Sequence, residues 1–152
     1  MQCATKILTL LISLLSAGNS VIAGVTRVEN HCGFTIWCAS AKNDGTASAT
    51  RALSGGSSAT FQNIYNDNIG VSLKTTFSGS KFPNKFARTV KGGIAWYDLS
   101  AIDGDPFLAQ RRVGYWANTN CQIVCNPGDT TSCEFPYMPT CPDPTDMVLT
   151  FC

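Results

Sequence analysis

Histidine is almost absent from this chain of 152 residues, which contains only His31. A Ser-His-Asp or Cys-His catalytic arrangement would have to use His31, which lies directly beside Cys32 at an expected strand end. A zinc site also lacks ligands, because Cys121 and Cys125 form a single C-x₃-C pair with no second pair. We therefore expect a surface histidine, no bound metal and no cofactor.

The sequence also lacks an excess of charge of either sign. Without residues 1–23 the chain carries ten Lys+Arg and ten Asp+Glu, because Lys6 is the one charged residue in that segment. Nucleic acids and anionic membranes are recognised through a cationic field, so we expect neither as a partner. There is no Asn-x-Ser/Thr sequon, no internal repeat and no amphipathic helix of ten residues or more.

One long apolar run stands at the N-terminus. Lys6 precedes a nine-residue run over 7–15 that only Thr9 and Ser13 interrupt, and small residues lie around Ala23. This pattern indicates a secretory signal peptide cleaved after Ala23 rather than a buried N-terminal helix. A membrane span needs roughly 20 apolar residues, and no other segment approaches that length. We expect residues 1–23 to be removed and residues 24–152 to form one secreted, monomeric domain.

Cysteine is abundant by contrast. In an oxidising compartment, cysteines form disulfides far more often than metal sites. Their number is odd after signal removal, so one thiol is unpaired or bonds another chain. Within an expected strand over 34–39, Cys38 shares a face with Phe34 and Ile36, so we interpret Cys38 as a buried core residue and the free thiol. The sequence has eight cysteines, and Cys3 lies in the predicted signal peptide. The seven that remain are Cys32, Cys38, Cys121, Cys125, Cys133, Cys141 and Cys152.

Short alternating segments separated by turns make up the rest of the chain, which predicts an all-β sandwich or flattened barrel. In the segment 111–117 we expect Val113 and Tyr115 to face the core. Trp37 and Trp116 then lie on the faces of their strands that point away from the expected core residues. They either pack on a second sheet or stay exposed. Residues 118–146 are rich in Pro and Cys and predict little regular structure. The expected strands are 25–29, 34–39, 51–53, 59–62, 69–75, 94–99, 111–117 and 147–151.

The segment 93–107 is the candidate site. It begins as a strand and ends in the turn sequence Asp103-Gly-Asp-Pro106, so carboxylates gather beside aromatic side chains. Aromatic faces next to hydrogen-bond acceptors are typical of carbohydrate-binding surfaces. Alternatively, Asp98 and Asp103 only satisfy N–H groups in turns. The candidate binding residues of this segment are Trp96, Tyr97, Asp98, Asp103, Asp105 and Phe107.

Three motifs resemble those of thaumatin-like proteins. The first, Val28 to Trp37, is similar to the opening V-N-x-C-x-[YF]-T-[VI]-W, and the second, Tyr97 to Gly104, is similar to Y-D-[VI]-S-x-[VI]-D-G. The third, Thr140 to Cys152, resembles the ending T-C-P…T-F-C. The short length and the segment Trp96 to Phe107 are similar to the small fungal branch that includes the Blastomyces yeast-phase-specific protein. The resemblance covers residues 24–152 and is weakest over 40–85.

This resemblance implies an all-β, disulfide-stapled antiparallel β-sandwich without the large inserted domain of the bigger relatives. The disulfide-rich insertion of those relatives is reduced here to residues 118–144. The family pattern implies that Cys38 stays single and that the bridges are Cys32–Cys152, Cys121–Cys141 and Cys125–Cys133.

The resemblance also has consequences for glycan binding and for glycoside hydrolysis. Plant relatives have an acidic cleft of one arginine, one glutamate and three aspartates, linked to binding of β-1,3-glucan. Two of these aspartates match Asp98 and Asp103. The arginine of the cleft matches Lys74, and its glutamate is replaced by Lys85. Asp105 is the candidate substitute for the last aspartate. Glycoside hydrolysis needs two suitably placed carboxyl groups, so we expect Lys74 and the candidate residues to bind a glycan and not to cleave it.

The predicted function is that of a secreted protein at the fungal cell surface or wall. The resemblance suggests spore or conidial germination, or wall remodelling, through binding of a cell-wall polysaccharide such as β-glucan. The alternative is a host-interaction protein, an adhesin, invasin or effector in virulence that binds a host surface protein. A weak β-1,3-glucanase is the third interpretation.

Overall fold

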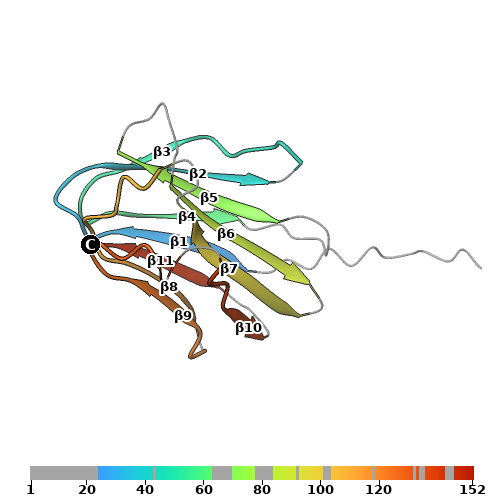
Figure 1. Cartoon of the computed structure of the whole chain (residues 1–152). Coiled ribbons are helices and arrows are strands. Elements are labelled where there is room, and N and C mark those ends of the chain that lie inside the picture. The colour runs from blue at the N-terminus through green and yellow to red at the C-terminus, as the bar shows by residue number, and fades with distance from the viewer. Residues whose placement is uncertain are drawn as a thin grey trace, which may run out of the picture.

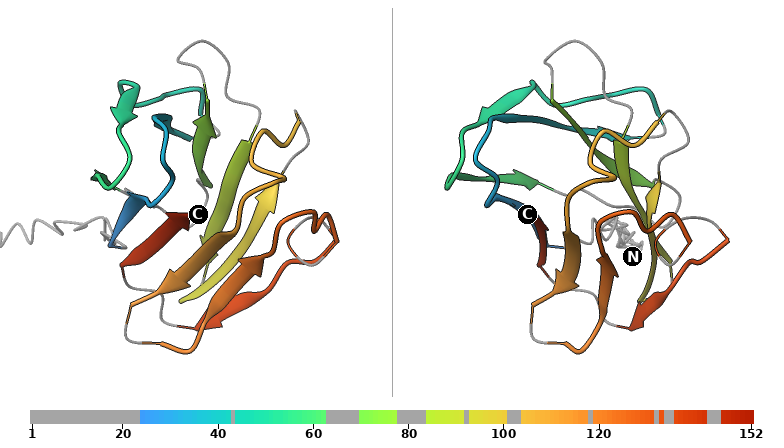
Figure 2. Two further views of the ribbon diagram at one scale, coloured as in Figure 1. Left: turned by 90° about the vertical axis from the view of Figure 1, so that its left-hand side faces the viewer. Right: turned by 60° about the vertical axis from the view of Figure 1, so that its left-hand side comes forward.

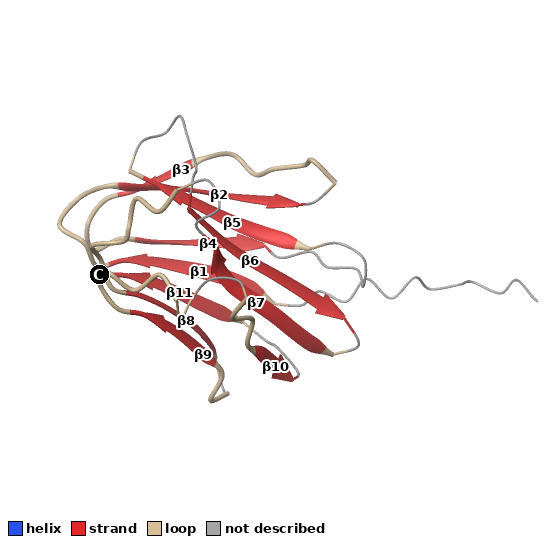
Figure 3. Ribbon diagram, in the orientation of Figure 1, coloured by secondary structure: helices blue, strands red, loops and turns tan. Residues whose placement is uncertain are grey.

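The computed structural model describes residues 24–42, 44–62, 70–77, 84–91, 93–100, 104–117, 119–131, 133, 136–142 and 146–152. The predicted signal peptide over 1–23 and the candidate residue Asp103 lie outside the described residues. Within the described ranges all regular structure is β-strand (Figure 3). No helix in this part of the chain is long and apolar enough to cross a membrane.

The strands form two sheets that face each other (Figure 1). One sheet has five strands in the order β4-β1-β11-β8-β9, and the other has six in the order β10-β7-β6-β5-β2-β3. The strands are β1 Val25–Asn30, β2 Ile36–Lys42, β3 Arg51–Leu53, β4 Ser58–Gln62, β5 Val71–Thr76, β6 Asn84–Lys91, β7 Ile94–Ser100, β8 Arg112–Trp116, β9 Gln122–Cys125, β10 Thr140–Pro142 and β11 Met147–Phe151.

Two strands lie in the Pro- and Cys-rich region that was expected to have little regular structure. β9 and β10 have four and three residues, and each is the edge strand of its sheet. An edge strand needs ladder hydrogen bonds on one side only, so Pro142 is tolerated at the end of β10. Such short edge strands carry almost no periodic signal in the sequence.

One strand pair departs from the expected antiparallel arrangement. The first and last strands, β1 and β11, run parallel, with Thr26 opposite Met147 and Asn30 opposite Phe151. These two strands lie side by side in both views of Figure 2. A parallel pair requires a long crossover connection, and here the whole domain between the two strands supplies it. Directly beyond this pair, Cys32 and Cys152 are joined with their Cα atoms 5.0 Å apart.

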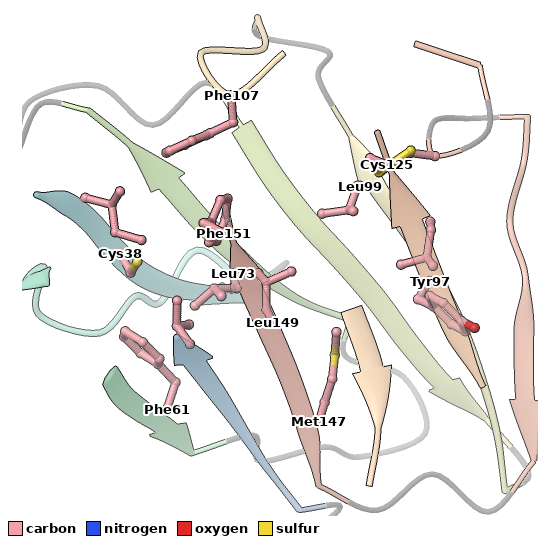
Figure 4. Close-up of a cluster of buried hydrophobic side chains, with 14 of the residues drawn as sticks. Cys38, Phe61, Leu73, Tyr97, Leu99, Phe107, Cys125, Met147, Leu149 and Phe151 are labelled. Atoms are coloured by element: carbon pink, nitrogen blue, oxygen red, sulfur yellow. A yellow bond between two sulfur atoms is a disulfide. The ribbon is translucent and has the colours of Figure 1, made fainter. Parts of the chain in front are cut away.

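The core lies between the sheets, and Figure 4 shows its main side chains. On β7 the buried face consists of Ala95, Tyr97 and Leu99, while Ile94 is exposed. On β8 the prediction had the wrong face, because Arg112, Gly114 and Trp116 are buried and Tyr115 is exposed. The physical reason is sheet-to-sheet packing: the Trp116 ring lies 4.3 Å from the Tyr97 ring on the opposite sheet.

Three disulfide bridges join Cys32 to Cys152, Cys121 to Cys141 and Cys125 to Cys133. These are the pairs that the family resemblance implies. Cys38 is a free cysteine, fully buried on β2. Burial raises the pKa of the Cys38 thiol to about 12, because the thiolate would lose its hydration. At neutral pH this thiol therefore packs as a small hydrophobic group.

Candidate functional site

Two of the aromatic candidates belong to the core and not to a binding surface. Tyr97 is 2 % exposed, and its hydroxyl donates a hydrogen bond to the Gln122 carbonyl oxygen, 3.4 Å away. Burial, and secondarily Tyr137, raise the pKa of Tyr97. Phe107 is fully buried, with its ring 4.6 Å from that of Phe151. Both side chains belong to the core, so we leave Tyr97 and Phe107 out of the proposed binding surface.

Asp105 is also withdrawn from the surface. Its Oδ1 accepts a hydrogen bond from the Phe107 backbone N–H at 3.0 Å, and its Oδ2 lies 2.5 Å from Arg112 Nη1. The Asp105 side chain is 8 % exposed and that of Arg112 is 1 % exposed. Asp105 therefore fixes the loop before β8 through a buried ion pair, and it cannot stand in for the missing aspartate of the acidic cleft.

Trp96 and Asp98 lie on the other face of β7, which points away from the core. Both are half-buried, and their neighbours on this strand, Ala95, Tyr97 and Leu99, are buried. Side chains alternate between the two faces of a strand, so Trp96, Asp98 and the exposed Ile94 share the outer face of the six-stranded sheet. The structure therefore places two of the predicted site residues, Trp96 and Asp98, on the same outer face of the six-stranded sheet.

Cross-strand pairing extends this outer surface on both sides of Trp96. Thr89 on β6 and Thr140 on β10 are its register partners, and both are exposed. Directly opposed residues share a face, and strands lie about 4.8 Å apart, so this row spans about 10 Å. In the next row, Pro142 lies opposite Ile94. We call this surface the Trp96 face; it consists of Thr89, Ile94, Trp96, Asp98, Thr140 and Pro142.

Lys74 lies on the same sheet but outside the Trp96 face. It is half-buried on β5, and its backbone partners are Ala39 on β2 and Lys85 on β6. In the register, Asp98 lies opposite Ala87 on β6, and Ala87 lies opposite Ser72 on β5. Ser72 is two residues before Lys74. Two strand spacings and two residues separate Asp98 from Lys74, which is about 12 Å. The structure therefore does not bring Lys74 against Asp98.

The sequence-based reasoning missed Thr89 and Thr140, because their place beside Trp96 depends on strand pairing. It also missed a pocket of ≈ 480 Å³ at the opposite edge of the six-stranded sheet, lined among others by Lys42, Arg51 and Phe61. A second, smaller pocket of ≈ 190 Å³ surrounds Glu29 and His31. In the described part of the chain, no three His, Cys, Asp or Glu side chains come together as a possible metal site.

The two facing sheets, together with the disulfide between Cys32, just after β1, and Cys152, just after β11, define a thaumatin-like β-sandwich. Solved structures agree: the protein elicitor MoHrip2 from Magnaporthe oryzae is similar with a TM-score of 0.75 and 20% identity, over 86% of this chain and 99% of that one. The thaumatin-like xylanase inhibitor TLXI is similar with a TM-score of 0.60 and 15% identity, over 84% and 98% of the two chains.

Residues 13–152 match the family described as Bys1, the Blastomyces yeast-phase-specific protein, and the chain belongs to that family. This agrees with the resemblance read from the three sequence motifs. A comparison with curated protein sequences found no match.

Proposed function

We propose that this protein is secreted and acts at the fungal cell surface or wall by binding a wall polysaccharide through the Trp96 face. Its biological setting would be spore or conidial germination or wall remodelling. The observation that carries the proposal is the row Thr140–Trp96–Thr89, in which one aromatic side chain is flanked by two exposed hydroxyl groups across three strands.

The chemistry of the Trp96 face supports a neutral glycan. An indole ring offers apolar area to the C–H faces of sugar rings, and hydroxyl and carboxylate groups beside it accept or donate hydrogen bonds to sugar hydroxyls. The surface is built on three paired strands, so its groups are held without the entropy cost of ordering a loop.

Cleavage of the glycan is not part of the proposal. A glycosidase needs a protonated carboxyl group and an ionised one on opposite sides of the scissile bond. Asp98 lies on the Trp96 face, whereas Asp105 is bound to Arg112 and the Phe107 N–H. Asp105 thus offers no second carboxyl group for catalysis. Release of reducing sugar from laminarin that is lost in Asp98→Asn would contradict this view.

Sedimentation with insoluble β-glucan and with chitin tests the proposal. Trp96→Ala should lower the bound fraction by about tenfold or more, because the apolar platform is lost, and Asp98→Asn should lower it less. Tyr115→Ala is the matched control, since Tyr115 is exposed on the outer face of the other sheet. Binding that is absent in the unchanged protein, or equal in Trp96→Ala and Tyr115→Ala, would refute the site.

A second candidate function is binding of a host surface protein. Tyr137 is 48 % exposed and Met138 is 44 % exposed, and both lie in the segment just before β10. Aromatic and Met side chains are enriched at protein interfaces. The structural neighbours described as an elicitor and as a xylanase inhibitor add to this interpretation. Immunostaining of spores, hyphae and infected tissue separates the two candidates: signal on the fungal wall favours the first, and signal on host cells favours the second.

A further inference from the structure

The inner face of β2 changes character halfway along the strand. Ile36 and Cys38 are buried, but the next residues on that face, Ser40 and Lys42, are polar and half-buried. Their register partners on β5, Leu73 and Val71, are buried, which confirms that this face points between the sheets. The apolar core therefore stops at this corner of the sandwich, and the ≈ 480 Å³ pocket opens there, between β2, β3 and the edge strand β4.

Arg51 is held in place within this pocket. Its Nη1 donates a hydrogen bond to the Thr60 carbonyl oxygen at 3.1 Å, and its guanidinium carbon lies 5.3 Å from the centre of the Phe61 ring. Phe61 is a buried member of the core cluster (Figure 4). It also lines the pocket and forms its apolar floor. A guanidinium group has five N–H donors, and among the described residues no carboxylate pairs with Arg51. The cation is preorganised and retains donors for a ligand.

Lys42 adds a second cation, and none of the described residues that line the pocket is acidic. The neighbouring acid is Asp44, which is fully exposed and accepts hydrogen bonds from the Thr46 N–H and hydroxyl at 2.9 and 2.6 Å. These hydrogen bonds, and to a smaller extent Lys42, lower the pKa of Asp44. Asp44 thus offsets part of the Lys42 charge from outside the pocket, and in the described part of the chain no carboxylate pairs with Arg51.

The remaining lining mixes polar and apolar groups, and Ala47 and Phe61 supply apolar surface. The Ser40 hydroxyl and the Gln62 amide both line the pocket and make no hydrogen bond to another described residue. The apolar surface at the floor belongs to Phe61, whose ring already carries the Arg51 guanidinium. The pocket is rich in donors and has the size typical of small-molecule sites, about 300 to 1,000 Å³.

We propose that this pocket binds a small saccharide unit that carries one anionic group, a carboxylate or a phosphate ester. Arg51 and Lys42 would bind the anionic group, and Ser40 and Gln62 would bind sugar hydroxyls. A bare inorganic anion would leave most of the volume to water, whose molecules take about 30 Å³ each. The pocket is distinct from the Trp96 face, because β2 and β7 are separated by β5 and β6 in the sheet.

Titration of the ¹⁵N-labelled protein followed by NMR tests the inference. The probes are glucuronic acid, glucose 6-phosphate, glucose and inorganic phosphate. We expect saturable shifts at the amides of Ser48 and Phe61 with one or both charged sugars, and binding of glucose and of phosphate that is at least about tenfold weaker. Whichever charged sugar binds identifies the source of the anion as a uronic acid or a phosphorylated sugar.

Charge variants locate the site. Arg51→Gln should weaken binding of the charged sugar by about tenfold or more, because a charge-assisted hydrogen bond to the anionic group is lost. Lys42→Gln should weaken it less. Arg27→Gln is the matched control, since it removes one positive charge from an exposed arginine that pairs with Glu29 at 3.0 Å on β1.

Several results would overturn the inference. These are the absence of saturable binding of either charged sugar, equal binding of glucose, equal binding of inorganic phosphate, or an unchanged affinity in Arg51→Gln. Thermal unfolding of each variant verifies that it is folded. If Arg51→Gln fails to fold, Lys42→Gln and the position of the shifted amides decide the question.

Discussion

Arg112 and Asp105 form a buried ion pair at one end of the sandwich, with Nη1 and Oδ2 2.5 Å apart. The register places Arg112 opposite Phe151 on one side and Cys125 on the other, and both of these residues are fully buried. Arg112 Nε and Nη2 are buried and have no hydrogen-bond partner among the described residues. Asp105 is therefore the main compensation for a positive charge that lies within the core.

Removing one partner of this pair should be costly. In Arg112→Met the Asp105 carboxylate loses its counter-ion in a site shielded from water, and we expect a loss of about 3 to 5 kcal/mol in the free energy of unfolding. The double variant Asp105→Asn/Arg112→Met should recover most of that loss, because no buried charge remains and the introduced amide oxygen can still accept a hydrogen bond from the Phe107 N–H. Urea unfolding of the unchanged protein and both variants measures these differences.

The neighbouring Arg111 provides the control for this experiment. It is exposed, so Arg111→Met should change the free energy of unfolding by no more than about 0.5 kcal/mol. Equal losses in Arg111→Met and Arg112→Met would show that the buried pair contributes nothing specific.

The disulfides should differ in their contributions according to the loops they close. Cys32 and Cys152 are separated by 120 residues in the sequence, whereas Cys125 and Cys133 are separated by eight. The chain-entropy relation predicts about 5 kcal/mol for the first bridge and about 2.5 kcal/mol for the second. Replacing both cysteines of each pair by alanine and measuring urea unfolding should give losses in that order. The reverse order would mean that native-state contacts, and not loop closure, dominate.

The alternation of apolar and polar residues predicts most of the strands but not always which face of a strand is buried. The expected segments 51–53 and 147–151 coincide with β3 and β11. On β8, Val113 and Tyr115 are at least as apolar as Arg112 and Gly114, so the local pattern favoured the wrong face. Burial of Arg112 depends on Asp105 and on the opposite strands, and these contacts are not encoded within the segment.

The candidate site shows the same limit. Trp96 and Asp98 share a face because side chains in a strand alternate, so this part follows from the sequence alone. The neighbour Thr140 requires that β10 pair with β7, and β10 is too short to show a period. The pocket around Arg51 requires that β2 and β4 approach each other from different sheets, which no local pattern contains.

Burial of Cys38 should make the stability of the protein sensitive to alkaline pH. The thiol pKa rises from 9.0 to about 12 in the folded protein, so above pH 9 the unfolded chain loses this proton and the folded chain keeps it. Folding stability from this group is thus fully present below pH 9 and falls by about 1.4 kcal/mol per pH unit as the pH approaches 12.

Cys38→Ala is the variant that tests this dependence, and unfolding curves between pH 7 and about 10 are the measurement. The variant should be less stable at pH 7, because a buried group is removed, but its stability should decline less steeply above pH 9. Parallel pH profiles for the two proteins would show that Cys38 does not titrate differently on unfolding. In the unchanged protein, iodoacetamide should modify Cys38 only after denaturant is added.

Gly55 lies where a side chain has no room. A Cβ atom at this position would collide with the carbonyl oxygen of Cys32, a residue that the bridge to Cys152 holds in place. Gly55→Ala should therefore destabilise the protein by about 1 to 3 kcal/mol through overpacking. At Gly33 a Cβ would meet nothing within 4 Å, so Gly33→Ala is the matched control and should be nearly neutral. Thermal unfolding that ranks the two variants equally would contradict this difference.

The two proposed ligand sites should be separable by mutation and by salt. Trp96→Ala should lower sedimentation with β-glucan by about tenfold or more and leave binding of the charged sugar unchanged. Arg51→Gln should weaken binding of the charged sugar by about tenfold or more and leave sedimentation with β-glucan unchanged. Binding at Arg51 and Lys42 depends on charge, so it should weaken between low and high salt, whereas contact of a neutral glycan with Trp96 should not. Each variant is measured with both ligands, with Tyr115→Ala and Arg27→Gln as controls. If either variant loses both activities while remaining folded, the sites are not independent, and the separation of β2 from β7 in the sheet does not isolate them.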